Sequence, residues 1–121
     1  MPRFVILRHE SPQGVHFDFM LEVGDALKTW ALPDVPQAGV EMDCKALADH
    51  RLAYLDYEGP IAGDRGVVTR WDCGTYTIER QDDEEWAVTL AGAQLAGQVT
   101  LRRAADDSTW WRFSLARQDR S

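Results

Sequence analysis

Histidine and aspartate side chains near the start of the chain have the types and spacing of a metal site. His16 and Asp18 stand two residues apart in a segment whose polar and apolar residues alternate. On a strand, residues two apart project from the same face, about 7 Å apart along the backbone. His9 precedes this pair and could supply a third ligand. Two imidazoles and one carboxylate suit Mn²⁺, Zn²⁺ or Fe²⁺ better than Ca²⁺ or Mg²⁺.

Spacing alone leaves other interpretations of these residues open. A His-x-Asp pair on a strand that faces solvent is most often ordinary polar surface. Oxygenase barrels with two histidines and one carboxylate also use such a pair, and in that case His16, Asp18 and His50 would be the ligands. Spacing by itself does not separate these interpretations.

Strands must position these side chains, because the dominant period of the sequence is two. In residues 15–23 the alternation directs the aromatic residues toward a core and places His16 and Asp18 on the opposite face. A tight turn at residues 24–25 leads into a second hairpin arm at residues 26–32. The candidate ligands therefore belong to the polar face of a hairpin strand.

The rest of the chain also predicts strands and almost no helix. β-Branched and aromatic residues predict further strands at 4–8, 67–71, 75–80, 86–90, 98–103 and 110–115. Turn-forming residues separate some of them at 72–74, 82–85 and 105–108, and one short helix is expected at 44–49. We therefore expect a mainly β fold, a single-domain antiparallel β-barrel with little helix that spans residues 1–121. Closure into a barrel is favoured because it removes exposed strand edges.

The composition limits the function classes. Among 121 residues, 13 Lys+Arg stand against 20 Asp+Glu, for a net charge of −7. This balance disfavours strong non-specific binding to DNA, but a local arginine cluster or a metal could still hold a nucleic-acid end. No apolar run approaches the roughly 18 residues of a membrane span, and the opening residues are charged too early for a signal peptide. We expect a cytoplasmic monomer with reduced thiols at Cys44 and Cys73.

An ordered set of motifs resembles one protein family. The opening RFVILRHESPQGVHFDFMLEVGDALKTWALP is similar to the start of the 3′-phosphoesterase domain of bacterial DNA ligase D, in which a histidine precedes HYDFRLE and GxLKSWAVPKG. DHRLAYLDYEGPI and RWDCGTY then match the later family segments DHPLxYxxFEG and WDxGTW. The resemblance runs in order from Arg3 to about Leu115. It is strongest to the short, free-standing branch, which lacks the ligase and polymerase modules.

The resemblance implies a β-barrel with an active site on a concave outer surface, and it implies a role for each matching residue. His9, His16 and Asp18 would hold a divalent metal, Mn²⁺ or a related ion such as Zn²⁺, which polarises the phosphoryl group and acidifies a bound water. His50 would donate a hydrogen bond or a proton on the phosphate side, assisted by Tyr54. The separation between His9 and His16 is one residue longer than in the family pattern.

The family removes a 3′-phosphate, or a 3′-terminal ribonucleotide and then its phosphate, from DNA ends to leave a 3′-OH. The expected function is therefore that of a metal-dependent phosphoesterase on 3′ ends of nucleic acid, in DNA repair. The alternative is a catalytically weak or inactive metal-binding module that recognises a phosphorylated end, a nucleotide or a protein partner. The expected partners are a nucleic-acid 3′ end or a small phosphoester, and repair proteins such as a ligase or a polymerase.

Two cations of the family pattern are missing from this chain. Met20 stands where the family has an arginine on the metal face, and Asp34 stands where it has a lysine. Loss of one donor to a developing charge commonly lowers the rate by about 10²–10³. Arg65, in a short glycine-bounded loop, or Arg51, next to His50, could replace part of this phosphate clamp. For both arginines the alternative is a solvated surface side chain.

Overall fold

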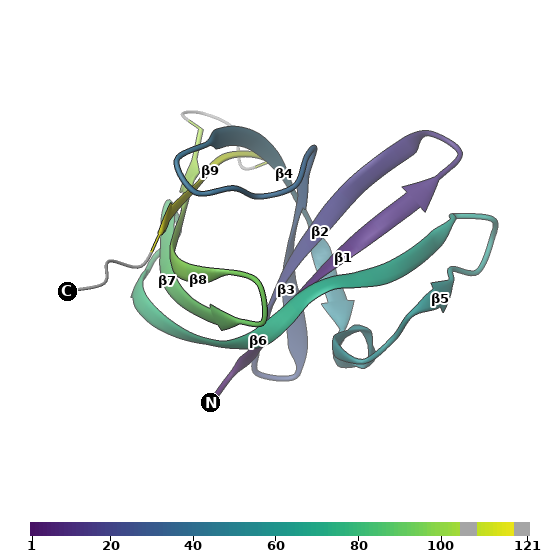
Figure 1. Ribbon diagram of the computed structural model, residues 1–121, viewed down its shortest axis with the longest axis horizontal. Coiled ribbons are helices and arrows are strands. Elements are labelled where there is room, and N and C mark those ends of the chain that lie inside the picture. Colours follow the sequence, from purple (N-terminus) through teal and green to yellow (C-terminus); the bar gives the residue numbers. More distant parts are fainter. Residues whose placement is uncertain (105–108, 118–121) are drawn as a thin grey trace.

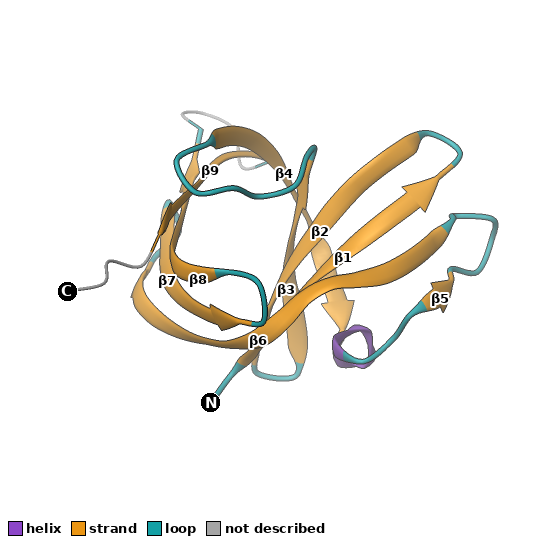
Figure 2. Ribbon diagram, in the orientation of Figure 1, coloured by secondary structure: helices purple, strands orange, loops and turns teal. Residues whose placement is uncertain are grey.

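The computed structural model describes residues 1–104 and 109–117, and its main feature is a closed antiparallel barrel (Figures 1 and 2). The elements are β1 (Arg3–Ser11), β2 (Gly14–Val23), β3 (Ala26–Leu32), β4 (Glu41–Arg51), the 3₁₀ helix η1 (Leu52–Leu55), β5 (Gly59–Pro60), β6 (Val67–Gln81), β7 (Glu85–Gly92), β8 (Ala96–Arg103) and β9 (Trp110–Arg117). Strands make up 69% of the described residues and helix 4%, which confirms the predicted fold class.

Pairing around the sheet closes eight of these strands into the barrel. The hydrogen-bonded order is β1-β2-β3-β4-β9-β8-β7-β6, and β6 pairs back with β1. The short strand β5 pairs with the first residues of β6 only. Figure 1 shows β5 and η1 outside the barrel, on the side of β1 and β6. This excursion between β4 and β6 forms one wall of the candidate site.

Two local predictions are wrong. The helix expected at residues 44–49 is part of β4, which pairs with β3 and β9 and so joins the two halves of the barrel. Its short Ala- and Leu-containing stretch has only a weak helical preference. Backbone hydrogen bonding to the strands on both sides outweighs that preference.

The turn expected at residues 72–74 is also wrong, because β6 runs through it. Gly74 allows close backbone approach instead, since a Cβ there would lie 2.1 Å from the carbonyl oxygen of Ala91. The first half of β6 pairs with β1 and the second half with β7. The turn expected at residues 105–108 lies outside the described residues.

Aromatic side chains fill the interior of the barrel. Trp30 is fully buried, and its ring meets Trp86 and Trp111 edge-on, with centroids 5.8 and 5.7 Å away. Phe19, which faces inward as the alternation of β2 requires, packs against Trp30 at 6.2 Å. Trp110, one residue from Trp111, points the other way and is 47% exposed. The interior is thus a packed core, and a binding site must lie on the outside or at an end.

A second apolar cluster lies on the outer face of the barrel wall. Its buried members come from β1, β2, β3, η1 and β6: Val5, Leu7, Met20, Leu27, Leu55 and Val68. Tyr54 of η1 and Ile61, which follows β5, pack against it. Residues of a strand alternate between faces, so this part of the wall has an apolar core on each side. Of the outward-facing residues of β2, Asp18 and Met20 are therefore buried beside the excursion that contains η1 and β5.

The two cysteines lie on opposite sides of this wall and are both free. Cys44 is part of the interior cluster, whereas Cys73 packs against the outer one. Burial raises the pKa of the Cys44 thiol to about 12, with a smaller contribution from Asp43. Within the described residues no helix is long and apolar enough to cross a membrane.

Cys44 is therefore expected to resist thiol reagents in the folded protein. In a Cys73→Ser variant, which leaves Cys44 as the single thiol, reaction near neutral pH should be negligible until the chain is unfolded, because the thiolate is the reactive form. Colorimetric titration with an aromatic disulfide measures this. Reaction of the native variant at the rate of a free thiol would contradict the buried position of Cys44.

Candidate active site

The first hairpin brings His9, His16 and Asp18 together on the outer face of the wall. A two-residue turn connects β1 and β2, and the resulting register sets His9 opposite His16 and Leu7 opposite Asp18. Directly opposed residues share a face, and so does Asp18, two residues beyond His16. One possible ligand atom from each of the three side chains lies within 4.8 Å of the others. The regular register accommodates the longer separation between the two histidines without a bulge.

The carboxylate of Asp18 is the centre of this cluster. Its Oδ2 lies 3.4 Å from His9 Nδ1, and its Oδ1 lies 3.0 Å from His16 Nε2. Asp18 is only 3% exposed, yet its buried Oδ1 has no hydrogen-bond partner among the described residues, so the 3.0 Å contact lacks hydrogen-bond geometry. A buried carboxylate oxygen without a partner is costly. A divalent cation among these three atoms would remove that cost, and the donor set fits a transition metal.

Electrostatics at the cluster also favour a positive charge. The contact with the Asp18 carboxylate raises the pKa of His16 above its ordinary value, while partial burial of the ring acts in the opposite direction. Asp18 therefore stabilises added positive charge beside it, whether that charge is a proton on His16 or a bound cation.

A backbone carbonyl determines which nitrogen of His9 faces Asp18. His9 Nε2 lies 2.6 Å from the carbonyl oxygen of Arg65, and since that oxygen can only accept, Nε2 carries the proton. Nδ1 is then unprotonated and directed to Asp18, the state that a metal ligand needs. The sequence analysis missed this role of Arg65, because a backbone atom has no signature of its own.

Glycines place this carbonyl. Gly63 and Gly66 have φ values of +79° and +101°, and Asp64 between them has φ 55°. Gly66 is packed against β1, so that a Cβ on it would lie 2.0 Å from the carbonyl oxygen of Glu10. The pair of glycines around Asp64 and Arg65 is the signal by which the sequence could have indicated a constrained loop.

A cavity of about 140 Å³ joins the cluster to the other residues singled out from the sequence. It is lined by Leu7, His9, Asp18, Met20, His50, Tyr54, Ile61, Arg65 and Val68. His50 donates from Nδ1 to the carbonyl oxygen of Ala48 at 2.9 Å, which leaves Nε2 available. The ring of Tyr54 meets His50 edge-on at 5.6 Å. Within the described residues the Tyr54 hydroxyl makes no hydrogen bond.

The two arginines and the two substituted positions are placed as follows. Arg65 lines the cavity, and its Nε donates to the carbonyl oxygen of Ala62 at 2.8 Å. Arg51 is exposed at the end of β4. Met20 is 1% exposed and forms an apolar part of the cavity wall. Asp34 is exposed in the loop after β3, where its Oδ1 accepts a hydrogen bond from the Val35 backbone N–H.

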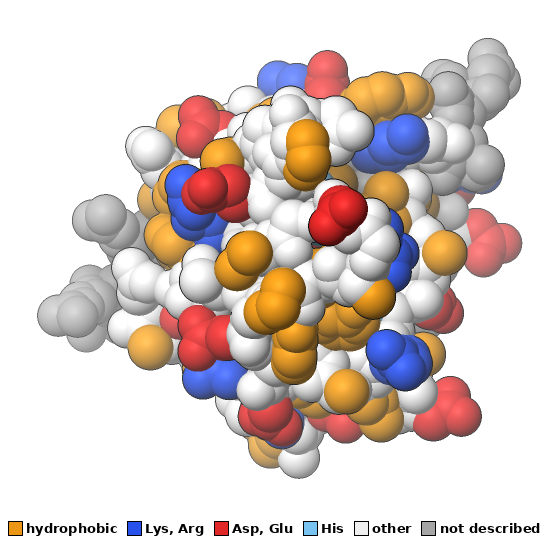
Figure 3. Space-filling model, turned by 90° about the vertical axis from the view of Figure 1, so that its right-hand side faces the viewer, with side chains coloured by type: hydrophobic (Ala, Val, Ile, Leu, Met, Phe, Trp, Pro, Cys, Tyr) orange, Lys and Arg blue, Asp and Glu red, His pale blue; other side chains and the backbone are white. Residues whose placement is uncertain are grey.

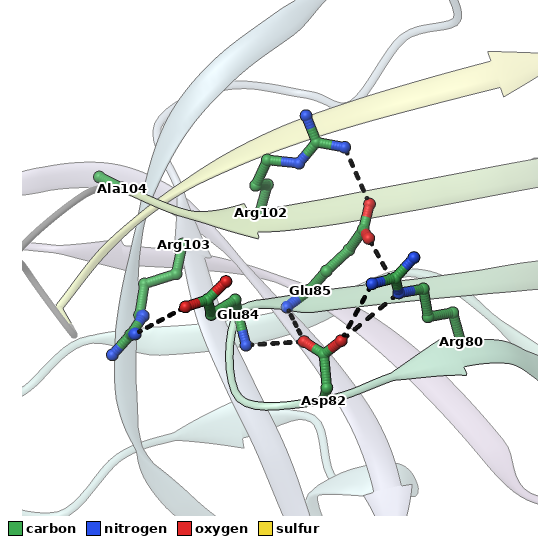
Figure 4. A pocket seen from close by; sticks show the side chains of 7 residues that line it. All are labelled: Arg80, Asp82, Glu84, Glu85, Arg102, Arg103 and Ala104. Carbon is green, nitrogen blue, oxygen red and sulfur yellow. Dashed lines mark hydrogen bonds and ion pairs between the residues drawn. The ribbon is translucent and has the colours of Figure 1, made fainter.

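A more voluminous hollow, of about 680 Å³, lies at the turn between β6 and β7 (Figure 4). There Glu85 pairs with Arg80 at 3.2 Å and with Arg102 at 3.0 Å, and Glu84 pairs with Arg103 at 3.7 Å. The backbone N–H groups of residues 84 and 85 donate to Asp82. Each of these carboxylates already has its partners, so the hollow is an ion-paired hairpin tip, at the turn predicted for residues 82–85.

Comparison with known proteins identifies the family of the chain. A family model of the DNA ligase D 3′-phosphoesterase domain matches residues 7–103. The chain is 34% identical over 113 residues to the multifunctional non-homologous end joining DNA repair protein LigD of Mycobacterium tuberculosis, and 36% identical over 111 residues to LigD of Pseudomonas aeruginosa. These matches cover 86% and 84% of this chain, but 15% and 13% of the relatives. The chain belongs to the DNA ligase D 3′-phosphoesterase domain family, which confirms the resemblance.

The two backbone carbonyls predict opposite tautomers for His9 and His50. At a pH where both rings are neutral, long-range ¹H–¹⁵N spectra should show His9 protonated at Nε2 and His50 protonated at Nδ1. The chain has three histidines, so the signals can be assigned by single substitutions. The reverse tautomer at either residue would contradict the geometry described.

Gly66→Ala should change the NMR signals of His9 and of no other histidine. The added Cβ would clash with the carbonyl oxygen of Glu10 and so displace the loop that carries the Arg65 carbonyl. Gly63→Ala is the matched control: it also places alanine at positive φ, but its Cβ would meet only Arg65 Nε, at 3.9 Å. Unchanged His9 signals in Gly66→Ala would show that the carbonyl does not orient this ring.

Proposed function

We propose that the protein is a metal-dependent phosphoesterase that acts on 3′-terminal phosphate or ribonucleotide ends of nucleic acid. The observation that carries this proposal is the buried Asp18 carboxylate between two histidines, at the wall of a cavity that His50 also lines. Its Oδ1 has no hydrogen-bond partner among the described residues. Family membership supports the reaction class. The relatives named for non-homologous end joining support a role in healing DNA ends during that repair.

His9 through Nδ1, His16 through Nε2 and Asp18 would hold the cation, for which Mn²⁺ is expected and Zn²⁺ is the main alternative. When bound, such an ion supplies a Lewis acid that polarises the phosphoryl group. The carbonyl of Arg65 keeps His9 in the tautomer that this arrangement needs.

His50 and Tyr54, which line the same cavity as the metal cluster, can donate hydrogen bonds or a proton to the reacting phosphate ester. In hydrolysis a water oxygen bonds to phosphorus, the bond from phosphorus to the sugar 3′ oxygen breaks, and that oxygen takes up a proton. With Nδ1–H donated to Ala48, a protonated His50 carries its second proton on Nε2 and can give it to the leaving oxygen. The Tyr54 hydroxyl is free to donate to a phosphoryl oxygen. The products are a 3′-OH and inorganic phosphate.

Arg65 is the residue of this chain that can replace part of the missing phosphate clamp. Its side chain lines the cavity and has no acidic partner within the described residues. A guanidinium there can bind two phosphate oxygens at once. Because Arg65 also orients His9 through its carbonyl, a test of the clamp must change the side chain only, as in Arg65→Gln.

The second candidate function is a metal-binding module that recognises a phosphorylated end, a nucleotide or a protein partner with little or no turnover. The observation that favours it is Met20, since a buried methionine gives the cavity an apolar wall where the family pattern has a cation. The metal cluster itself is unaffected by this difference.

The Asp18→Asn variant tests whether Asp18 belongs to a metal site, which both candidate functions require, or to ordinary polar surface. The wild-type protein with Mn²⁺ should bind one ion per chain and release phosphate from a 3′-phosphorylated oligonucleotide. Asp18→Asn should lose the ion and slow phosphate release about 100-fold or more, because both histidines face this carboxylate. Calorimetry and phosphate release measure the two effects. Asp83→Asn, which removes the same charge at an exposed position, is the control and should change neither.

Two outcomes are informative beyond that comparison. One Mn²⁺ per wild-type chain without phosphate release, from either a 3′-phosphate or a terminal ribonucleotide, supports the binding module. Absence of metal binding by the wild type would contradict both candidate functions.

Met20→Arg should raise turnover about tenfold or more, because it restores a donor to the charge that develops on the phosphoryl group. Met20→Gln, which is polar but uncharged, should not. Both variants disturb the buried outer cluster, so thermal unfolding and Mn²⁺ binding are measured alongside the rate. A folded, metal-binding Met20→Arg protein with unchanged turnover would reject the missing arginine as the limit on activity.

A further inference from the structure

A second cavity adjoins the one at the metal cluster. It measures about 270 Å³ and is lined by Arg51, Ala53, Tyr54, Tyr57, Pro60, Ile61, Ala62 and Arg65. Tyr54, Ile61 and Arg65 line both cavities, so the two lie next to each other, and we refer to them together as the groove. The groove runs from Asp18 and His50 along η1 toward β5.

The charges in this second cavity are all positive. Arg51 and Arg65 are its charged lining residues, and neither forms an ion pair with any described residue. Along the whole groove Asp18 is the single carboxylate among the lining residues. Although the chain has a net charge of −7, two arginines without ion-pair partners among the described residues line this cavity together with two tyrosines. Such a concentration of positive charge fits an anionic ligand.

Aromatic rings continue from His50 into this cavity. Tyr54 packs edge-on against His50 at 5.6 Å and against Tyr57 at 5.8 Å. The Tyr57 hydroxyl donates to the carbonyl oxygen of Pro60, which fixes the ring in the cavity lining while 36% of the residue stays exposed. A held, exposed ring is a stacking surface for a planar base.

The surface agrees with this description. Figure 3 views the side of the molecule that carries β5, and hydrophobic side chains, tyrosine and proline included, gather in the middle of that face. Lys and Arg side chains lie around them, interspersed with Asp and Glu side chains. The apolar centre suits the flat base of a ligand, and the positive charge for its phosphates comes from the two lining arginines.

We propose that the second cavity binds the nucleoside that carries the terminal phosphate, with its base against Tyr57 and the phosphate on its 5′ side at Arg51. The proposal rests on the proposed function, since it takes the terminal 3′-phosphate to lie between Asp18 and His50. Arg65, which lines both cavities, would contact that terminal phosphate. The volume is near the lower end of small-molecule pockets, as a single nucleoside requires. The protein thus recognises the last nucleotide of a strand through the phosphates on both sides of it.

Binding of small nucleotides tests this without any need for turnover. The probes are inorganic phosphate, a deoxynucleoside 3′-monophosphate and a deoxynucleoside 3′,5′-bisphosphate, each titrated calorimetrically into the Mn²⁺-loaded protein. We expect the bisphosphate to bind about tenfold more tightly than the monophosphate, because a charge-assisted contact to Arg51 is added. Arg51→Gln should abolish that difference and leave the affinities for the monophosphate and for inorganic phosphate unchanged. Arg102→Gln, which makes the same change in net charge away from the groove, should alter none of them.

The stacking surface is tested by Tyr57→Leu. This variant should lower the affinity for both nucleotides about tenfold and leave the affinity for inorganic phosphate unchanged. If that variant does not fold, Ala53→Phe, at an exposed lining position, should have the same effect by filling the cavity.

Equal affinity of the wild type for the two nucleotides would overturn the proposal. So would an Arg51→Gln effect that is the same for all three probes, because it would reflect general electrostatics. These failures are distinct from failure of the proposed function, which is loss of Mn²⁺ binding or absence of phosphate release. If the protein binds the nucleotides as described but does not hydrolyse a 3′-phosphate, the nucleoside subsite is supported and the proposed catalytic function is rejected.

Discussion

A carboxylate that is buried without enough hydrogen bonds organises the functional face of this protein. Asp18 is covered by the outer apolar cluster, and each of its oxygens faces one imidazole, yet its Oδ1 has no hydrogen-bond donor among the described residues. A buried negative charge is stable only when positive charge lies close to it. This arrangement is the basis of the proposed cation site, and the other groups of the cavity lie around it.

One excursion of the chain both buries Asp18 and completes its surroundings. The residues between β4 and β6 cover the outer face of β1 and β2 with Leu55 and Ile61, and they also supply Tyr54 and the carbonyl of Arg65. Exclusion of water and placement of polar groups thus come from the same segment. Low local polarity strengthens each of the remaining electrostatic contacts.

Alternation along the strands was sufficient to predict the barrel class, the first hairpin and the shared face of His16 and Asp18. It was not sufficient for β4, whose Ala- and Leu-containing stretch is decided by pairing on both sides, or for β6, where Gly74 accommodates a neighbouring backbone rather than a turn. The burial of Asp18 also has no local signal, since its cover lies more than thirty residues away. The carbonyl of Arg65 is a backbone atom, which only the adjacent glycines could have indicated.

All three candidate ligands come from one hairpin with a two-residue turn, and this has a consequence for the order in which the barrel assembles. Hairpins of this kind form within microseconds, whereas joining β1 to β6 must close a loop of about sixty residues and is slower. The cation of the proposed site would therefore find its ligands on β1 and β2 while the rest of the chain is still open. Under that proposal, metal binding and folding would be coupled from the first strand pair onward, and a bound ion would stabilise the hairpin to which the remaining strands add.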